Sequence, residues 1–175
     1  FFAGISFFQF SLLISLMSSL AAIAIYLEPY RYIRFISFTE PFENFYGPGW
    51  QLSNALLGIG RGEWFGMGLG NSLQKNLYLP EPHTDFIFAV IVEEFGLIGG
   101  LIVILLFALL IYGILVTSIK ALELGKLFQG LLAFGAGILI AIQVVFNLGV
   151  NLGLLPTKGL TLPFISYGGT SLILF

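Results

Sequence analysis

Residues Phe86 to Ile119 read FIFAVIVEEFGLIGGLIVILLFALLIYGILVTSI, and Glu93 and Glu94 are the only charged side chains in that run. The hydrocarbon core of a bilayer is about 30 Å thick, and a helix of about 20 residues crosses it. Lipid offers the backbone no hydrogen-bond partners, so a segment that crosses it must satisfy its own N–H and C=O groups. We therefore expect residues 86–119 to form a transmembrane helix.

Other apolar runs lie on both sides of this one. Residues 1–27 carry no charge, and residues 127–150 form another run of spanning length. Residues 164–175 begin a further span that is too short as it stands to cross. The alternating pattern of a membrane barrel is absent from the sequence. We predict an all-α fold, a polytopic bundle of transmembrane helices at 1–27, 86–119 and 127–150, with the truncated start of a fourth at 164–175.

The composition points to the same class. Of the 175 residues, 58% are hydrophobic and 9% are charged, whereas soluble domains carry about 25% charged side chains. No basic stripe is present, so we expect no nucleic-acid partner. The absence of Cys gives no information about the redox compartment. Because the chain begins with Phe1 and stops at Phe175 within an apolar run, we expect a piece of a longer protein, whose first span is not a signal peptide.

The connections between spans suggest an orientation. Residues 28–85 form a large polar loop, and by parity they share a membrane face with the short loop 151–163. The turn 120–126 carries Lys120 and Lys126, whereas 151–163 carries only Lys158, and an excess of Lys marks cytoplasmic loops. We predict that 120–126 is cytoplasmic and that 28–85 and 151–163 are extracytoplasmic.

Asp85 stands directly before the long apolar run, next to His83 and Thr84. One role for its carboxylate is to cap the helix that follows, by accepting backbone N–H groups at the positive end of the helix. Another is to act as a general base, or to bind a metal ion held by pyrophosphate, at the edge of a cavity. The residues alone leave both roles open. His83 is a candidate proton carrier or a donor that positions the turn, and a single His provides no metal triad.

Two further polar groups are candidates for the same site. Glu93 lies about 80° around the helix from Asp85, so the two side chains could share a cavity. Lys158 follows Pro156 in the loop on the predicted Asp85 face and could pair with a phosphate or with Asp85. The alternatives are that Glu93 bonds to a neighbouring helix and that Lys158 extends to the membrane interface.

The segment from Gly58 to Ser72 is dense in Gly. Its amide groups could cradle an anion, or Gly could simply permit tight turns in an interfacial or re-entrant loop. It lacks the Gly-Lys-Ser/Thr ending of a nucleotide-binding P-loop. Gly96, Gly99 and Gly100 would let a second helix pack closely against the 86–119 helix.

The chain also carries a set of longer motifs. They are Gly60-Arg61-Gly62-Glu63, Gly68-Leu69-Gly70-Asn71-Ser72 with Gln74-Lys75, Tyr78-Leu79-Pro80-Glu81, His83-Thr84-Asp85-Phe86-Ile87-Phe88-Ala89, Glu93-Glu94 with Gly96, and Leu155-Pro156-Thr157-Lys158-Gly159-Leu160-Thr161-Leu162-Pro163 through Ser166-Tyr167-Gly168-Gly169. Together they resemble the SEDS family of bacterial cell-wall polymerases, and within it the division branch more than the elongation branch. Gly49-Trp50, where the division branch often has Gly-Tyr, is a small departure.

The resemblance implies a ten-helix membrane fold, of which this chain would be the last four spans. It implies a glycosyltransferase that polymerises lipid II and releases undecaprenyl pyrophosphate, with Asp85 at the position of the family's catalytic Asp. Positive charge for the leaving pyrophosphate would come from Arg61, Lys75 or Lys158, or from a divalent cation such as Mg or Mn. The other substrate-binding candidates are His83, Thr84, Thr157 and Glu93.

The resemblance also implies partners and a location. These are lipid II, a cognate class B penicillin-binding protein and other divisome membrane proteins, at the division septum of the bacterial cytoplasmic (inner) membrane. Two alternatives to an enzyme remain on the residues alone. One is a flippase that moves lipid II across the bilayer, and the other is a non-catalytic scaffold that recruits the penicillin-binding protein.

Overall fold

The computed structural model describes residues 6–27, 38–43, 45–47, 49–74, 84–157 and 159–167. Its helices are α1 (Phe7–Leu27), α3 (Trp50–Gly62), α4 (Ile87–Glu123) and α5 (Leu127–Asn151), and no strand occurs within those ranges. The predicted all-α class is confirmed. Residues 163–165 form a turn, and the part of the predicted 164–175 span beyond residue 167 lies outside the described residues.

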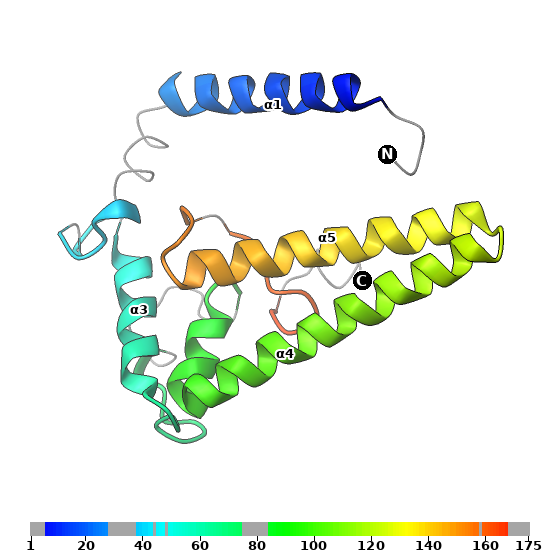
Figure 1. Ribbon diagram of the computed structural model, residues 1–175. Coiled ribbons are helices and arrows are strands. Elements are labelled where there is room, and N and C mark those ends of the chain that lie inside the picture. Colours follow the sequence, from blue (N-terminus) through cyan, green and yellow to red (C-terminus); the bar gives the residue numbers. More distant parts are fainter. Residues whose placement is uncertain are drawn as a thin grey trace.

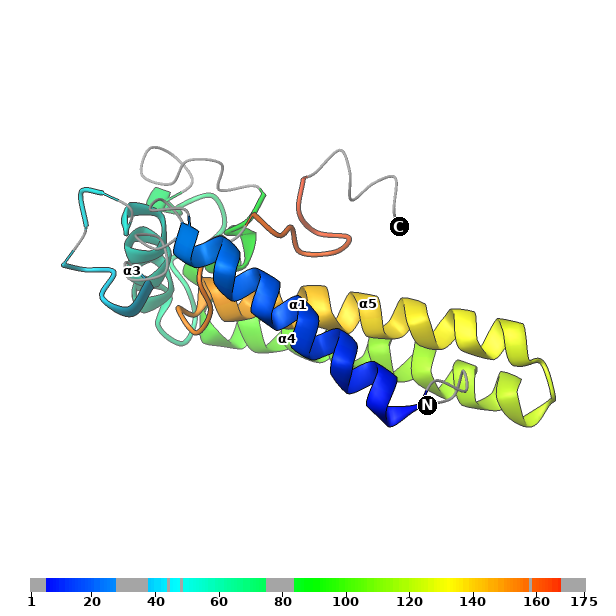
Figure 2. The same ribbon diagram turned by 90° about the horizontal axis from the view of Figure 1, so that it is seen from above.

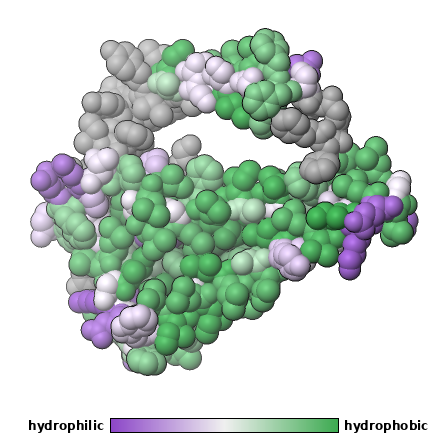
Figure 3. All heavy atoms as spheres, viewed as in Figure 1, coloured by the Kyte–Doolittle hydropathy of each residue, from purple (hydrophilic) through white to green (hydrophobic). Residues whose placement is uncertain are grey.

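Three of the helices are long and apolar enough to cross a membrane: Phe7–Ala24 within α1, Ile87–Glu123 and Leu127–Asn151. Helix α1 runs apart from the others and is exposed along most of its described length (Figure 1). In the space-filling view, hydrophobic side chains cover the middle of α4 and α5, and hydrophilic ones gather at the two ends (Figure 3). An apolar band between polar ends suits helices that span a bilayer.

Helices α4 and α5 form an antiparallel pair, visible from both directions (Figures 1 and 2). The pair packs closely through small residues, because a Cβ at Gly137 would lie 3.0 Å from Cγ2 of Ile114. A buried cluster of Phe107, Ile140, Val144 and Leu162 lies between the two helices and the segment after α5. Helix α4 continues through Lys120 to Glu123, so the turn between the helices is shorter than the predicted 120–126. Lys, Ala and Leu are strong helix formers, which explains the extension.

Helix α3 lies within the predicted large loop 28–85 and crosses one end of the α4–α5 pair (Figure 1). One face of α3 is buried, and Ala55 on that face packs with Phe86, Ala89 and Val150. Ser53 donates a hydrogen bond to the carbonyl oxygen of Pro41 at 2.7 Å, which fixes the preceding segment to the helix. The end of the pair with α3 also holds the start of α4 and the end of α5.

Helix α4 is broken at Gly96, where φ is 74° and ψ is −175°. In an unbroken helix the N–H of Leu97 and Ile98 would donate to the carbonyls of Glu93 and Glu94. Here the loop that follows α3 enters the break. Leu97 and Ile98 donate instead to the carbonyls of Glu63 and Trp64, at 2.8 and 3.4 Å.

The same loop satisfies the carbonyls that the break leaves unpaired. Met67 N donates to the carbonyl of Glu93 at 2.9 Å, and Gly68 N donates to that of Glu94 at 3.1 Å. Four hydrogen bonds with the loop thus replace two within the helix. A Cβ at Gly62, Gly66 or Gly96 would overlap backbone atoms of the other segment. The prediction of one continuous helix over 86–119, with Gly96 as a helix-packing residue, was therefore wrong at this point. Of the Gly-rich segment 58–72, the part up to Gly62 belongs to α3, and tight turns with positive φ occur at Gly66, Gly68 and Gly70.

Candidate active site

Asp85 lies where the start of α4 meets the end of α5. The side-chain amides of Asn147 and Asn151, both on α5, donate to the backbone carbonyl of Asp85 at 3.0 and 2.9 Å. Both Asn side chains are buried. The backbone position of Asp85 is therefore set by a neighbouring helix.

A side chain of the neighbouring helix α5 accepts a hydrogen bond from the first turn of α4. Phe86, and not Asp85, occupies the N-cap position, and no side chain forms a hydrogen bond from there. Ala89, in the first turn, donates its N–H to Oδ1 of Asn151 at 3.1 Å. Asn151, on the neighbouring helix, therefore satisfies one of the first-turn N–H groups of α4.

Asp85 is half-buried, and its carboxylate lies beside Gly159 in the segment that follows α5. A Cβ at Gly159 would lie 3.0 Å from Oδ2 of Asp85, so only a residue without a side chain fits there comfortably. Asn147 also donates to the carbonyl of Leu160 at 2.6 Å, which holds this segment to the same helix. Asn147 therefore positions both sides of the site.

Of the predicted substrate-binding residues, the structure places Thr84 and Thr157 near this end of the molecule. Thr84 adjoins Asp85 and is partly exposed, whereas Thr157 is 9% exposed in the segment between α5 and Gly159. The predictions for Lys75, His83 and Lys158 fall outside the described residues.

Glu93 is fully buried and serves as an anchor for the chain after the Gly-rich loop. Its Oε2 accepts the hydroxyl of Ser72 at 2.5 Å and the backbone N–H of Gln74 at 3.4 Å, and its Oε1 accepts the N–H of Leu73 at 3.3 Å. A carboxylate with 0% exposure and these three donors does not reach a substrate in this conformation. Its partners lie in the segment after the Gly-rich loop, and not on a neighbouring helix as the alternative expected.

Arg61 lies in the last turn of α3, level with the Gly96 break. Gly62 packs against Val92, whereas Asp85 lies seven residues earlier, just before α4 begins at Ile87. The Arg61 side chain lines a cavity on another face of α3. The structure therefore does not bring Arg61 and Asp85 into one site.

No group of three or more His, Asp or Glu that could hold a metal ion occurs among the residues described. Mg²⁺ in phosphate chemistry is usually held by one or two carboxylates and the substrate's own phosphates. Asp85, as one partly exposed carboxylate, fits that mode and does not by itself make a protein-only cage.

Sequence reasoning missed Asn147 and Asn151. Their signal was present in the sequence, because two Asn spaced four residues apart lie on one face of a mostly apolar helix. Polar residues within membrane helices are costly unless they have partners. The partners themselves, a backbone carbonyl and an N–H of another helix, were not readable from the spacing.

The fold and this site define a polytopic membrane protein with a carboxylate held at one end of a helix pair. The model of the FtsW, RodA and SpoVE family, described as cell cycle proteins, matches residues 1–175. The chain belongs to that family, and the predicted resemblance is confirmed.

Individual relatives agree with this family assignment. Proteins named "Probable peptidoglycan glycosyltransferase FtsW" from Aromatoleum aromaticum, Pseudomonas fluorescens and Hahella chejuensis are 49%, 45% and 47% identical to this chain. Each alignment covers 99% of this chain, but the chain spans only 42–44% of the length of these relatives.

A solved structure is also similar. It is described as "Structural coordination of polymerization and crosslinking by a peptidoglycan synthase complex", and one of its chains is 27% identical with a TM-score of 0.69. The match covers 97% of this chain and 46% of that one.

Proposed function

We propose that the intact protein is a peptidoglycan glycosyltransferase that polymerises lipid II into glycan strands during septal cell-wall synthesis. The observation that carries the proposal is the placement of Asp85, a half-buried residue whose backbone carbonyl accepts hydrogen bonds from Asn147 and Asn151. The names of the FtsW relatives and the peptidoglycan synthase complex support the reaction class.

In the proposed reaction, a sugar hydroxyl of the acceptor attacks the anomeric carbon of the lipid-linked donor. A new glycosidic C–O bond forms, the bond to the pyrophosphate oxygen breaks, and the configuration inverts. Asp85 accepts the hydroxyl proton, and the polyprenyl pyrophosphate leaves with the electron pair. A fixed backbone serves this step because a general base must lie within hydrogen-bond reach of the proton that it takes.

The leaving pyrophosphate needs positive charge close by. Lys158 directly precedes Gly159, which lies against the Asp85 carboxylate, so we assign this role to Lys158 ahead of Arg61. We also propose Lys75 and His83 as groups that stabilise the leaving pyrophosphate. We propose Thr84 and Thr157 as groups that bind the sugar. A divalent cation would supply further positive charge to the pyrophosphate, and Asp85 is a carboxylate that could help to hold it.

The proposed partners are lipid II, a cognate class B penicillin-binding protein that crosslinks the new strands, and other divisome membrane proteins. The proposed location is the division septum of the bacterial cytoplasmic membrane. The partner in the solved peptidoglycan synthase complex supports a joint polymerising and crosslinking assembly.

The experiment is to supply the intact protein and its penicillin-binding partner with purified lipid II in vesicles. We expect glycan polymer to form. Movement of labelled lipid II between leaflets without polymer formation would show that the protein is a flippase and not a polymerase. If the protein has neither activity but recruits its partner to the septum in cells, it is a scaffold.

A further inference from the structure

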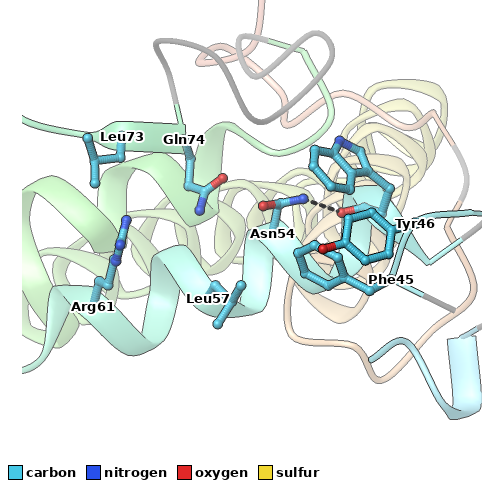
Figure 4. Close-up of a pocket in the computed structure, with 8 residues that line it drawn as sticks. Phe45, Tyr46, Asn54, Leu57, Arg61, Leu73 and Gln74 are labelled. Atoms are coloured by element: carbon cyan, nitrogen blue, oxygen red, sulfur yellow. Dashed lines mark hydrogen bonds between the residues drawn. The ribbon is translucent and has the colours of Figure 1, made fainter. Parts of the chain in front are cut away.

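The cavity lined by Arg61 lies on a face of α3 turned away from Ala55 and the start of α4. It has a volume of about 460 Å³, which is within the size range of small-molecule sites. Its lining comes from the segment before α3, from one face of α3 and from the chain after the Gly-rich loop (Figure 4). The lining residues are Phe45, Tyr46, Trp50, Asn54, Leu57, Arg61, Leu73 and Gln74.

One end of the cavity is aromatic. The ring of Phe45 packs edge-on against those of Tyr46 and Trp50, with ring centroids 5.2 Å apart in each pair. The rings of Tyr46 and Trp50 are stacked at 6.3 Å. Tyr46 is 94% exposed, so the cluster presents aromatic surface to whatever enters from outside.

The middle of the cavity carries two carboxamides. Asn54 is buried and its Nδ2 donates to the carbonyl of Trp50 at 2.8 Å. Gln74 is 3% exposed, and its side chain points from its own segment toward α3, between Asn54 and Arg61 (Figure 4). Its Oε1 accepts no hydrogen bond from any residue that the structure describes. A buried acceptor without a donor costs about 1–3 kcal/mol.

The orientation of Gln74 is fixed by its surroundings. Its backbone N–H donates to Glu93 at 3.4 Å, and its Cγ lies 3.0 Å from the position that a Cβ on Gly58 would occupy. Gly58 therefore makes room for the Gln74 side chain over α3. Gln74 lines the cavity, and its Oε1 is a buried acceptor without a donor among the described residues.

We propose that this cavity binds sugar rings of the glycan strand, at a subsite separate from Asp85. A pyranose ring has apolar C–H faces that suit exposed aromatic rings, and its hydroxyl and acetamido N–H groups supply the donor that Gln74 Oε1 lacks. A lipid tail has no donor for Oε1. This inference rests on the proposed polymerase function. The sugar rings bound in the cavity belong to the part of the glycan strand that has already been formed.

A strand held at this subsite would stay bound between successive additions. The subsite therefore affects the length of the product more than the chemical step at Asp85. Ala55, on the other face of α3, packs against Phe86, so α3 lies between the subsite and the start of α4.

The first test measures binding of a tetrasaccharide of β-1,4-linked N-acetylglucosamine to the intact protein in detergent, by saturation-transfer NMR. Wild type should bind it, and Gln74→Leu or Tyr46→Ala should weaken binding about three- to tenfold, the equivalent of one lost contact. The matched control is Phe42→Ala, an exposed aromatic near the cluster that does not line the cavity. This control should bind as wild type does.

The second test measures the length of glycan made from lipid II. Gln74→Leu should give shorter strands, and Phe42→Ala should give strands of wild-type length. Asp85→Asn should form polymer at least about 10²-fold more slowly yet still bind the tetrasaccharide, so failure of the proposed chemistry and failure of the subsite are distinguishable.

Two outcomes would overturn the subsite. One is the absence of tetrasaccharide binding to wild type at about 10 mM, a concentration that detects very weak sites. The other is binding that Gln74→Leu and Tyr46→Ala leave unchanged. If the tetrasaccharide fails to bind and a photocrosslinker at position 46 instead captures a protein segment, the cavity is a protein contact.

Discussion

At the scale of single residues, two carboxamides decide where the candidate base lies. Asn147 and Asn151 hold the carbonyl of Asp85, and Asn151 also accepts the N–H of Ala89. Because one side chain serves both the helix start and the site, stability and activity are coupled at Asn151. Removal of its amide leaves buried groups without partners.

Asn151→Ala should therefore lower the free energy of unfolding by about 1–3 kcal/mol and reduce polymer formation. Thermal unfolding in detergent measures the first effect and the lipid II assay measures the second. Thr117→Val is the matched control, because Thr117 is exposed and bonds only within its own helix, to Gly113. If Asn151→Ala behaves like this control, Asn151 does not hold the site together.

Glu93 and Ser72 allow a second residue-scale test. Glu93→Gln provides one acceptor oxygen where the wild-type carboxylate serves three donors, so we expect a destabilisation of about 1–3 kcal/mol. Combined with Ser72→Ala, the double mutant should lose less than the sum of the two single changes, since the residues share one hydrogen bond. Strict additivity would show that the bond contributes nothing. Glu40→Gln, at an exposed position, is the control.

At the scale of elements, the loop that enters α4 at Gly96 joins two segments that are distant in sequence. Irregular backbone within a membrane helix is tolerated when other protein groups satisfy it, and the loop provides four hydrogen bonds there. The backbone of Gly96 has φ 74° and ψ −175°, in a region that is almost exclusive to Gly.

Gly96→Ala should destabilise the protein by at least about 1–3 kcal/mol from backbone strain alone, and overlap with the carbonyl of Trp64 adds to this. The yield of folded protein after detergent extraction and its unfolding temperature measure the effect. Gly135→Ala is the control, because no atom lies within 4 Å of its Cβ position. It should be neutral or slightly stabilising, since Ala favours a helix. Equal behaviour of the two variants would contradict the account of the break.

The element scale also shows what sequence can and cannot predict. Unbroken apolar runs identified the cores of α1, α4 and α5, because length and hydropathy alone define a span. Helix α3 was missed because its polar surroundings resemble a loop and its buried face becomes apparent only against Phe86 and Val150. The break at Gly96 depends on a loop some 30 residues earlier, which periodicity within α4 cannot reveal.

At the scale of the whole molecule, α3, the start of α4 and the segment after α5 share one end of the helix pair, and the turn after Glu123 lies at the other (Figure 1). The sequence singled out Asp85 by its position before an apolar run, and its catalytic role was predicted from the family resemblance. The separation of Arg61 from Asp85 required the direction of α3. The Lys count predicts which end faces the cytoplasm.

Cysteine labelling tests that orientation, because this chain has no Cys of its own. In a cysteine-free version of the intact protein, Tyr46→Cys should react with a membrane-impermeant maleimide added to spheroplasts. Leu124→Cys should react only after the membrane is opened. Both positions are exposed, so a difference in labelling reports which side of the membrane each position faces. The reverse pattern would place Asp85 on the cytoplasmic side and exclude the proposed site of synthesis.

The central claim is that the Asp85 carboxylate takes the proton from the attacking sugar hydroxyl. The most direct measurement is the rate of glycan formation from lipid II by the intact protein with its penicillin-binding partner, comparing wild type with Asp85→Asn at matched folding and lipid II binding. The account predicts a loss of about 10²- to 10⁴-fold, the usual contribution of a general base. Polymerisation at the wild-type rate by the Asn variant would contradict it.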